Sequence, residues 1–354
     1  MKNSMLSIRN VILFGAILGS SAVKAGNEDR SGTAGASHLL VNPWSRGSAM
    51  ADAGIASSSG LEATFTNVAG LAFTEKTQIK FNSSNWMGNA GISFSSAGLA
   101  QRINEQGVFA VSIQAMNFGD IQVTTVANPE GKIGVFSPRI NVFNIGYARS
   151  FSSSIHAGIN FKVISESMTN MKSTGVAMDV GIKYVTGEKE QIKFGIALKN
   201  VGPTMKFKGD GLSQQATYSS TGQITTLNER SQEFELPALL NIGGSYDFIL
   251  DEKQKLIVAL GYTANSFSYD QFRLGLDYAM TTEKMAFNLK AGYAYEKNIM
   301  SSVNRSNALL GPTAGFSVDA LVGKNKNALG IEYCARFAGV FGTIHTIGAT
   351  ISLK

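Results

Sequence analysis

The chain has 354 residues, of which 31 are basic, 25 acidic, 38 glycine and only 6 proline, and 16% are charged. A single cysteine excludes an intramolecular disulfide framework, and the near balance of charge gives no indication of a nucleic-acid partner. Abundant glycine with few charges favours strands joined by turns, in two soluble domains or one large barrel.

Residues 1–25 have the features of a secretory signal peptide. Basic residues near the start precede a short apolar run at 11–18, and residues 23–25 form a small-x-small cleavage pattern. An N-terminal membrane anchor is the alternative, but the apolar run is far shorter than the ~20 residues that a spanning helix needs. We therefore expect export and cleavage just before Gly26.

Residues 26–73 differ from the rest of the chain, because those from residue 33 on are rich in alanine, glycine and serine and show no sustained period of 2. Small residues allow tight bends and close packing but do not build a lipid-facing wall. We interpret them as an N-terminal extension followed, over residues 36–73, by a hatch or plug. A flexible exported linker is the alternative, and the many apolar residues argue against it. The residues expected to hold the hatch are Leu39, Leu40, Trp44, Arg46, Met50, Asp52, Asn67 and Leu71.

Strands are clearest midway along the chain, where Phe161, Lys162 and Val163 illustrate a strict alternation of apolar and polar residues. This period of 2 puts the two sets on opposite faces of a strand. Because the pattern recurs to the end of the chain, we predict an all-β fold in which residues 74–354 form a fourteen-stranded antiparallel transmembrane β-barrel. The predicted strands are 77–85, 92–103, 107–118, 140–151, 155–168, 173–186, 191–202, 238–249, 255–265, 270–281, 285–296, 312–321, 327–337 and 342–353.

The predicted connections sort by length. With the N-terminus on the periplasmic side, every second connection should be periplasmic and short, and none of those assigned to that side exceeds five residues. The opposite side carries the long connections 119–139, 203–237 and 297–311. Since a soluble sandwich has no reason to sort its loops in this way, the sorting favours a barrel in the cell outer membrane.

Residues that could carry catalysis or bind a metal are scattered. His38, His156 and His345 are far apart and share no metal-ligand spacing with a carboxylate or with Cys334. Glycine-rich stretches lie inside predicted strands and open no helix, which argues against phosphate-binding loops. We therefore predict no catalytic, cofactor-binding or metal site, no cofactor and no enzyme activity.

The charged residues of the predicted strands face inward if the alternation is right. Both signs are present, which favours ion pairs that hold an internal plug over a pore selective for one sign. Plain solvated charges in the lumen are an alternative of equal weight. The expected lumen charges are Lys162, Asp179, Lys183, Lys193, Lys199, Asp247, Arg273, Asp277, Lys290, Asp319, Glu332 and Arg336.

Several segments share a pattern with a known family: 39–41, 46–56, 67–72, 121–125, 146–149, 158–162, 179–186 and 199–203. They resemble the PorV/PorQ family of Bacteroidota outer-membrane proteins, which belong to the type IX secretion system and are related in fold to the FadL hydrophobic-uptake channels. The chain departs from the family pattern at Val68, where proline is usual, and at Ala51, where glycine is usual.

The resemblance implies a fourteen-stranded barrel with an N-terminal hatch and a role as cargo carrier or attachment-complex member. The partners it implies are outer-membrane lipid, type IX translocon or attachment-complex proteins, and secreted cargo with C-terminal sorting domains, but no nucleic acid. The rival hypothesis is a FadL-like channel for hydrophobic small molecules, which needs an apolar pocket between hatch and wall and a lateral opening at a strand kink. A third interpretation is a soluble exported β protein.

Overall fold

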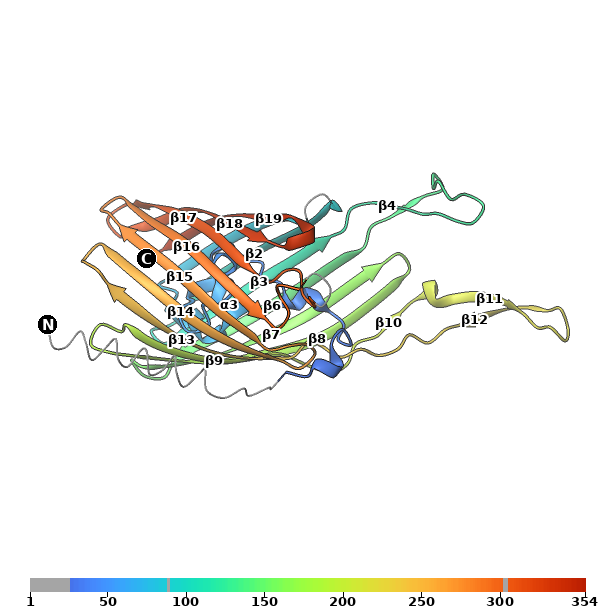
Figure 1. Ribbon diagram of the computed structural model, residues 1–354, viewed down its shortest axis with the longest axis horizontal. Coiled ribbons are helices and arrows are strands. Elements are labelled where there is room, and N and C mark those ends of the chain that lie inside the picture. Colours follow the sequence, from blue (N-terminus) through green and yellow to red (C-terminus); the bar gives the residue numbers. More distant parts are fainter. Residues whose placement is uncertain (1–25, 88–89, 302–304) are drawn as a thin grey trace.

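Fourteen antiparallel strands close into a barrel (Figure 1). The computed structural model describes residues 26–87, 90–301 and 305–354, so the predicted signal peptide lies outside the described residues. The barrel strands are β1 (Thr77–Trp86), β2 (Ile92–Arg102), β3 (Gly107–Asn117), β6 (Arg139–Ser150), β7 (Ile155–Met168), β8 (Met171–Thr186), β9 (Ile192–Val201), β13 (Leu239–Ile249), β14 (Gln254–Asn265), β15 (Gln271–Thr281), β16 (Met285–Glu296), β17 (Pro312–Val322), β18 (Asn327–Phe337) and β19 (Thr343–Leu353).

Neighbouring strands of the ring are consecutive barrel strands along the chain, and the pairing of β1 with β19 closes the ring. The pairing between β8 and β9 contains one register shift, between Met178 and Val180. The fourteen strands expected from the alternation are therefore confirmed. Every helix in the described part of the chain falls short of the length and apolar character that a membrane-spanning helix needs.

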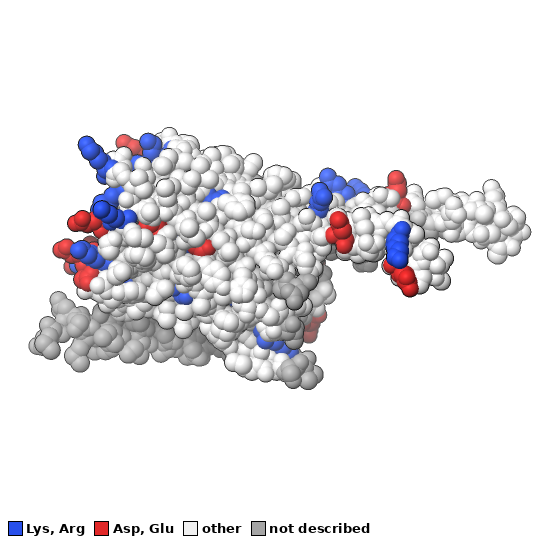
Figure 2. Space-filling model, turned by 90° about the horizontal axis from the view of Figure 1, so that it is seen from above, with Lys and Arg blue, Asp and Glu red and all other residues white. Residues whose placement is uncertain are grey.

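The barrel wall is apolar outside and polar inside. Phe161 and Leu289 face outward and are 53% and 62% exposed, whereas Asn160 and Lys162 face inward and are almost completely buried. Charged side chains gather at one end of the barrel and around the projecting loops, and the wall between them is largely free of charge (Figure 2). This arrangement fits a wall surrounded by lipid.

The two ends of the barrel differ in the length of their connections, as the sequence predicts. At the short-turn end the connections are residues 103–106, 151–154, 187–191, 250–253, 282–284 and 323–326. The long-loop end carries residues 118–138, 202–238 and 297–311, and the first two project far beyond the barrel (Figure 1).

Residues 36–73, which we call the inner segment, lie inside the barrel and contact the wall on several sides (Figure 1). Their helical turns are η2 (Ser37–Leu40), α2 (Ser45–Ala49), η3 (Gly60–Glu62), α3 (Ala63–Thr66) and η4 (Val68–Phe73). Helix α2 lies against β16 to β19, η3 against β1 and β2, and η4 against β3 and β6 to β8. The inner segment therefore packs around much of the barrel's inner surface.

Wall glycines make room for this packing. A Cβ added at Gly292 would lie 2.3 Å from the carbonyl carbon of Met50, and one at Gly158 would lie 2.8 Å from the carbonyl oxygen of Val68. Both distances are too short for a real side chain, so these wall positions accept the backbone of the inner segment only because they are glycine.

The N-terminal extension, residues 26–35, lies at the long-loop end. Its helix η1 (Glu28–Arg30) is followed by Gly35, whose N–H donates to Glu235 O at 3.0 Å, and Asn27 N–H donates to Asn265 O at 3.3 Å. The expectation that the N-terminus lies on the short-turn side is therefore wrong. The inner segment first runs through the lumen, and β1 then starts at the short-turn end, which is why the sorting of the loops was still predicted correctly.

Candidate functional site

An ion-pair network joins helix α2 to the wall. The Arg46 guanidinium lies 2.7 Å from Asp319 and 2.8 Å from Glu332, and Lys80 lies 3.0 Å from both Glu332 and Glu62. Glu332 is completely buried. Burial by itself would lower the pKa of Arg46, but the carboxylates of Glu332, Asp319 and Glu62 outweigh it and raise the pKa above its usual range. The guanidinium of Arg46 therefore stays charged, and the network binds the inner segment to β1, β17 and β18.

Hydroxyl groups complete the environment of the buried carboxylate. Ser45 donates to one oxygen of Glu332 at 2.6 Å, and Thr350 donates to the other at 2.6 Å. A buried charge is costly unless it is paired and hydrogen-bonded. The oxygen that accepts from Ser45 meets these conditions only while α2 is in place, whereas the other oxygen also contacts Lys80 and Thr350 of the wall.

A second polar contact lies at the turn after α2. Asn42 donates to one oxygen of Asp52 at 2.6 Å, and the other oxygen lies 3.4 Å from Arg273 and 3.5 Å from Arg336. Ala51 and Asp52 have left-handed backbones, with φ of 50° and 60°. Glycine adopts this conformation without strain, whereas residues with a side chain rarely adopt it.

Most of the expected lumen charges lie in cross-strand ion pairs or against the inner segment. Lys183 lies 4.1 Å from the ring of Phe73 and donates to Ser58 O at 3.0 Å, and Lys199 lies 3.7 Å from the ring of Phe65. The cross-strand pairs are Lys162–Asp179 at 2.6 Å, Lys193–Asp247 at 2.5 Å, and Lys290–Asp277.

The residues expected to hold the hatch lie inside the barrel. Trp44 and Leu71 are fully buried in one apolar cluster with residues of the wall. Asn67 donates to Ile55 O at 3.1 Å and to Ile182 O at 3.0 Å, so its side chain links the inner segment to β8. Of the others, Leu39, Met50 and Asp52 are buried and Leu40 is half-buried.

Sequence analysis placed Glu332 among the lumen charges but did not single out Lys80. Both lie at inward-facing positions between apolar outward neighbours, Lys80 between Ile79 and Phe81, so the alternation places them in the lumen. What the alternation could not supply is their partner, because Arg46 is far from Glu332 in the sequence and outside the barrel strands.

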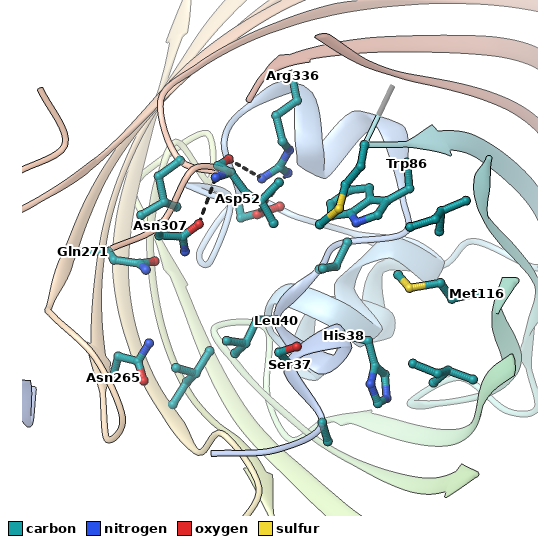
Figure 3. A pocket seen from close by; sticks show the side chains of 18 of the residues that line it. Ser37, His38, Leu40, Asp52, Trp86, Met116, Asn265, Gln271, Asn307 and Arg336 are labelled. Carbon is teal, nitrogen blue, oxygen red and sulfur yellow. Dashed lines mark hydrogen bonds and ion pairs between the residues drawn. The ribbon is translucent and has the colours of Figure 1, made fainter. Parts of the chain in front are cut away.

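A cavity of about 440 Å³ lies between the inner segment and the long-loop end of the wall. Asp52 and Arg336 lie beside each other at one side of it, with His38 across the cavity (Figure 3). Burial, together with the positive charge of Lys162, lowers the pKa of His38 to about 4, so its imidazole is neutral at pH 7. The apolar part of the lining includes Leu40, Val41, Trp86, Met116, Ile140 and Leu310.

Two hairpins project from the long-loop end (Figure 1). The first pairs β4 (Ile121–Gln122) with β5 (Val135–Phe136). The second leaves β9 through β10 (Phe207–Lys208), which pairs with β8, and ends in a ribbon of β11 (Ser213–Thr217) and β12 (Ile224–Asn228). Isolated two-stranded ribbons are marginally stable in water, and these expose apolar side chains such as Val126 and Ile224.

Ionisable residues of the described chain do not gather into a metal site: the described residues contain no group of three or more histidine, cysteine or acidic side chains that could hold an ion. Cys334 is buried. The charged groups of the lumen are instead arranged in pairs, some within the wall and some between the wall and the inner segment.

Comparison with known proteins identifies relatives by sequence pattern and by fold. The family model described as type IX secretion system protein PorV matches residues 24–266. No curated protein matches the chain.

Three solved structures show the same fold. The CymD monoaromatic hydrocarbon channel has a TM-score of 0.53 and 14% identity, over 88% of this chain and 97% of that one. The toluene transporter TodX of Pseudomonas putida has a TM-score of 0.52 and 12% identity, over 84% and 94%. A FadL homologue of Pseudomonas aeruginosa has a TM-score of 0.51 and 11% identity, over 88% and 98%. The barrel is thus FadL-like.

Proposed function

The chain belongs to the PorV family of type IX secretion system proteins, and we propose that it acts in the outer membrane as a carrier or attachment-complex member for secreted proteins. Its family and its FadL-like fold are both non-enzymatic kinds of protein. The cargo would be secreted proteins with C-terminal sorting domains. The observation that carries this proposal is the family match over residues 24–266.

The first part of the proposal is that the inner segment is a hatch that keeps the lumen closed. Its support is the packing of residues 36–73 against the wall and the buried ion pairs of Arg46 and Lys80. A fourteen-stranded barrel encloses more space than its own wall side chains fill. A protein that handles cargo outside its barrel needs a closed lumen, and the hatch would keep the lumen closed.

The second part is that the projecting hairpins recognise a protein partner. Connections as long as residues 202–238 are uncommon in compact proteins and are often functional. A β-bridge between Met205 and Phe234 joins the two strands at the base of this hairpin. Lys206 also donates a hydrogen bond to Glu233 there, which lowers the pKa of the Glu233 carboxyl. The ribbon beyond this root exposes backbone edges and apolar side chains, which suits pairing with an extended segment of a partner.

Deletion of residues 214–229 tests the proposal. The deletion removes the ribbon but keeps the bridge between Met205 and Phe234, so we expect a folded barrel in the membrane and a loss of cargo secretion. A matched control replaces only the turn at residues 218–222 with a shorter glycine turn, which keeps the ribbon. Unchanged secretion by the deletion variant, with a folded barrel, would contradict a role of this hairpin in partner recognition.

A FadL-like channel for hydrophobic small molecules is the alternative, and the cavity of about 440 Å³ favours it. The cavity has the mixed apolar and polar lining of many small-molecule sites. Replacement of Leu40 and Met116 by tryptophan would fill it. Loss of hydrophobic uptake with normal secretion would support the channel, and the reverse result would support the carrier.

A further inference from the structure

Outward-facing residues on β6, β7 and β8 form three rows whose chemistry changes toward the long-loop end. The row nearest the middle of the wall is apolar and exposed, and it consists of Phe143, Val163 and Val176. The next row is polar and uncharged, and it consists of Asn141, Ser165 and Thr174. The last row has a cation at each end, and it consists of Arg139, Ser167 and Lys172. The strand register places the three residues of each row directly beside one another.

Strand β10 extends the last row by one more cation. Lys208 of β10 lies directly opposite Lys172 of β8. Residues opposite each other in an antiparallel pair project from the same face of the sheet, and the neighbouring pair of Phe207 with Ser173 faces inward, because Ser173 is completely buried. Lys172 and Lys208 therefore both project outward, and both are exposed. We call Arg139, Lys172 and Lys208 the cation row.

The cation row has no acidic partner among the described residues. None of the ion pairs between described residues involves Arg139, Lys172 or Lys208. Two like charges directly opposite each other in a sheet repel and destabilise it. The arrangement of Lys172 beside Lys208 therefore favours an anion from outside the protein that lies between the two ammonium groups.

The cation row lies just beyond the apolar band of the wall. On β8 the outward apolar residues run from Tyr184, near the short-turn end, to Val176, which is about 26 Å along the strand at ~3.3 Å per residue. In a strand tilted by about 40° this length covers about 20 Å across the membrane, close to the ~25 Å of a barrel's apolar band. Lys172 lies about 10 Å farther out than Val176 on the same scale. This is the level of the lipid headgroups on the long-loop side, which is the outer leaflet.

Elsewhere in the ring the wall has aromatic residues close to its long-loop end. On β14, β15 and β16 an outward row at this end consists of Tyr262, Phe272 and Tyr295. Aromatic rings at this level are the usual interface girdle of a membrane barrel. The cation row is therefore a local feature of β6 to β10 and does not follow from the membrane alone.

The three rows match the parts of a phosphorylated glycolipid in the order in which they occur. Acyl chains lie against apolar wall side chains, and the hydroxyl and amide groups of sugars exchange hydrogen bonds with serine, threonine and asparagine. Phosphate groups pair with lysine and arginine. An acidic protein would also attract the cation row, but it would have no use for the apolar and uncharged rows, which lie deeper in the membrane.

We propose that the outward face of β6, β7, β8 and β10 binds a phosphate-bearing glycolipid of the outer leaflet. The phosphate group lies on the cation row, and the acyl chains lie along Val163 and Val176. This site does not depend on whether the barrel carries cargo or conducts small molecules, so it goes beyond the proposed function.

The test replaces both lysines, as Lys172→Gln with Lys208→Gln, in the full-length protein. In micelles of a neutral detergent this double variant should be at least as stable as the wild type, because the repulsion between the two lysines is removed. Its affinity for lipid A added to the micelles should fall about twenty-five-fold, at roughly fivefold for each lysine near an anionic lipid headgroup. Arg139→Gln alone should lower the affinity about fivefold.

The matched control is Lys206→Gln with Lys297→Gln. It also removes two exposed lysines from the long-loop end, but each of them is already paired with a carboxylate, Glu233 and Glu28 respectively. The control should therefore bind lipid A as tightly as the wild type does.

Two further measurements identify what is bound. Native mass spectrometry of the protein extracted from its own membrane should show a glycolipid on the wild type that the double variant has lost. Dephosphorylated lipid A should bind the wild type and the double variant equally, and inorganic phosphate should bind far more weakly than lipid A. Equal affinity of the wild type and the double variant for lipid A, an equal loss in the control, or inorganic phosphate that binds as tightly as lipid A would overturn the proposal.

Discussion

Removal of the Arg46 charge should loosen the inner segment while leaving the barrel wall folded. Methionine at this position, Arg46→Met, keeps most of the side-chain length and deletes the guanidinium. Arg46 is the ion-pair partner that the described residues give Asp319, whose side chain is 10% exposed. Glu332 loses one partner but keeps Lys80 and the hydroxyls of Ser45 and Thr350.

The free-energy cost of Arg46→Met follows from the partners that Asp319 loses and Glu332 keeps. Breaking a buried ion pair typically costs about 3–5 kcal/mol because a charge is left unpaired. Since Arg46 is 23% exposed and Glu332 retains other partners, we expect the lower end, about 3 kcal/mol. At ~1.4 kcal/mol per factor of ten, the open population of the inner segment should rise about a hundredfold.

Amide hydrogen exchange of the protein in bilayers or detergent measures this population directly. Peptides from residues 37–73 should exchange about a hundredfold faster in Arg46→Met, and those from β14 and β15 should not change. The matched control is Arg30→Met, because the pair of Arg30 with Glu235 is exposed on both sides and worth only about 0–1 kcal/mol. Equal exchange of residues 37–73 in both variants would refute the claim that buried charges hold the inner segment.

Two substitutions and one mass measurement test the packing, the wall and the export signal. Gly292→Ala should displace the backbone of Met50, which lies 2.3 Å from the added Cβ, and raise conductance in planar bilayers, whereas Gly244→Ala finds only ordinary contacts at 3.7 Å and should not. Leu289→Arg should weaken folding into bilayers by about 2–4 kcal/mol near the midplane, as measured by denaturant titration. Intact mass of the membrane-extracted protein should place its first residue near Gly26, and a mass that includes residues 1–25 would contradict cleavage.

The wall could be predicted from the sequence because its signal is local. A residue such as Phe161 or Lys162 faces outward or inward according to its position in a period of 2. The alternation of short and long connections then assigns each strand end to one end of the barrel. The structure confirms the fourteen strands on this basis. The register shift between Met178 and Val180 coincides with a break in the alternation of β9, where Lys199 and Asn200 are both buried and Val201 faces outward, and a strict period of 2 does not predict it.

The contacts of the inner segment could not be predicted because they depend on how it is placed inside the barrel. Arg46 meets Asp319 and Glu332 only because α2 lies against β17 and β18. A different rotation of α2 would have offered it other inward charges, such as Asp277, with the same sequence pattern. The position of the N-terminal extension at the long-loop end depends on the same placement.

The distribution of buried and exposed ion pairs indicates where residues 26–73 would open first. Release of their central part would strip partners from Glu332 and Lys183, both of which are buried, and such losses are costly. The N-terminal extension is held differently: Arg30 is 41% exposed in its pair with Glu235, and Lys297 is 52% exposed in its pair with Glu28. Exposed pairs contribute little, so we expect opening to begin at residues 26–35, beside the cavity, and to reach α2 only under much stronger destabilisation. Hydrogen exchange that spreads from the N-terminal extension inward would agree with this order, whereas uniform exchange across residues 26–73 would not.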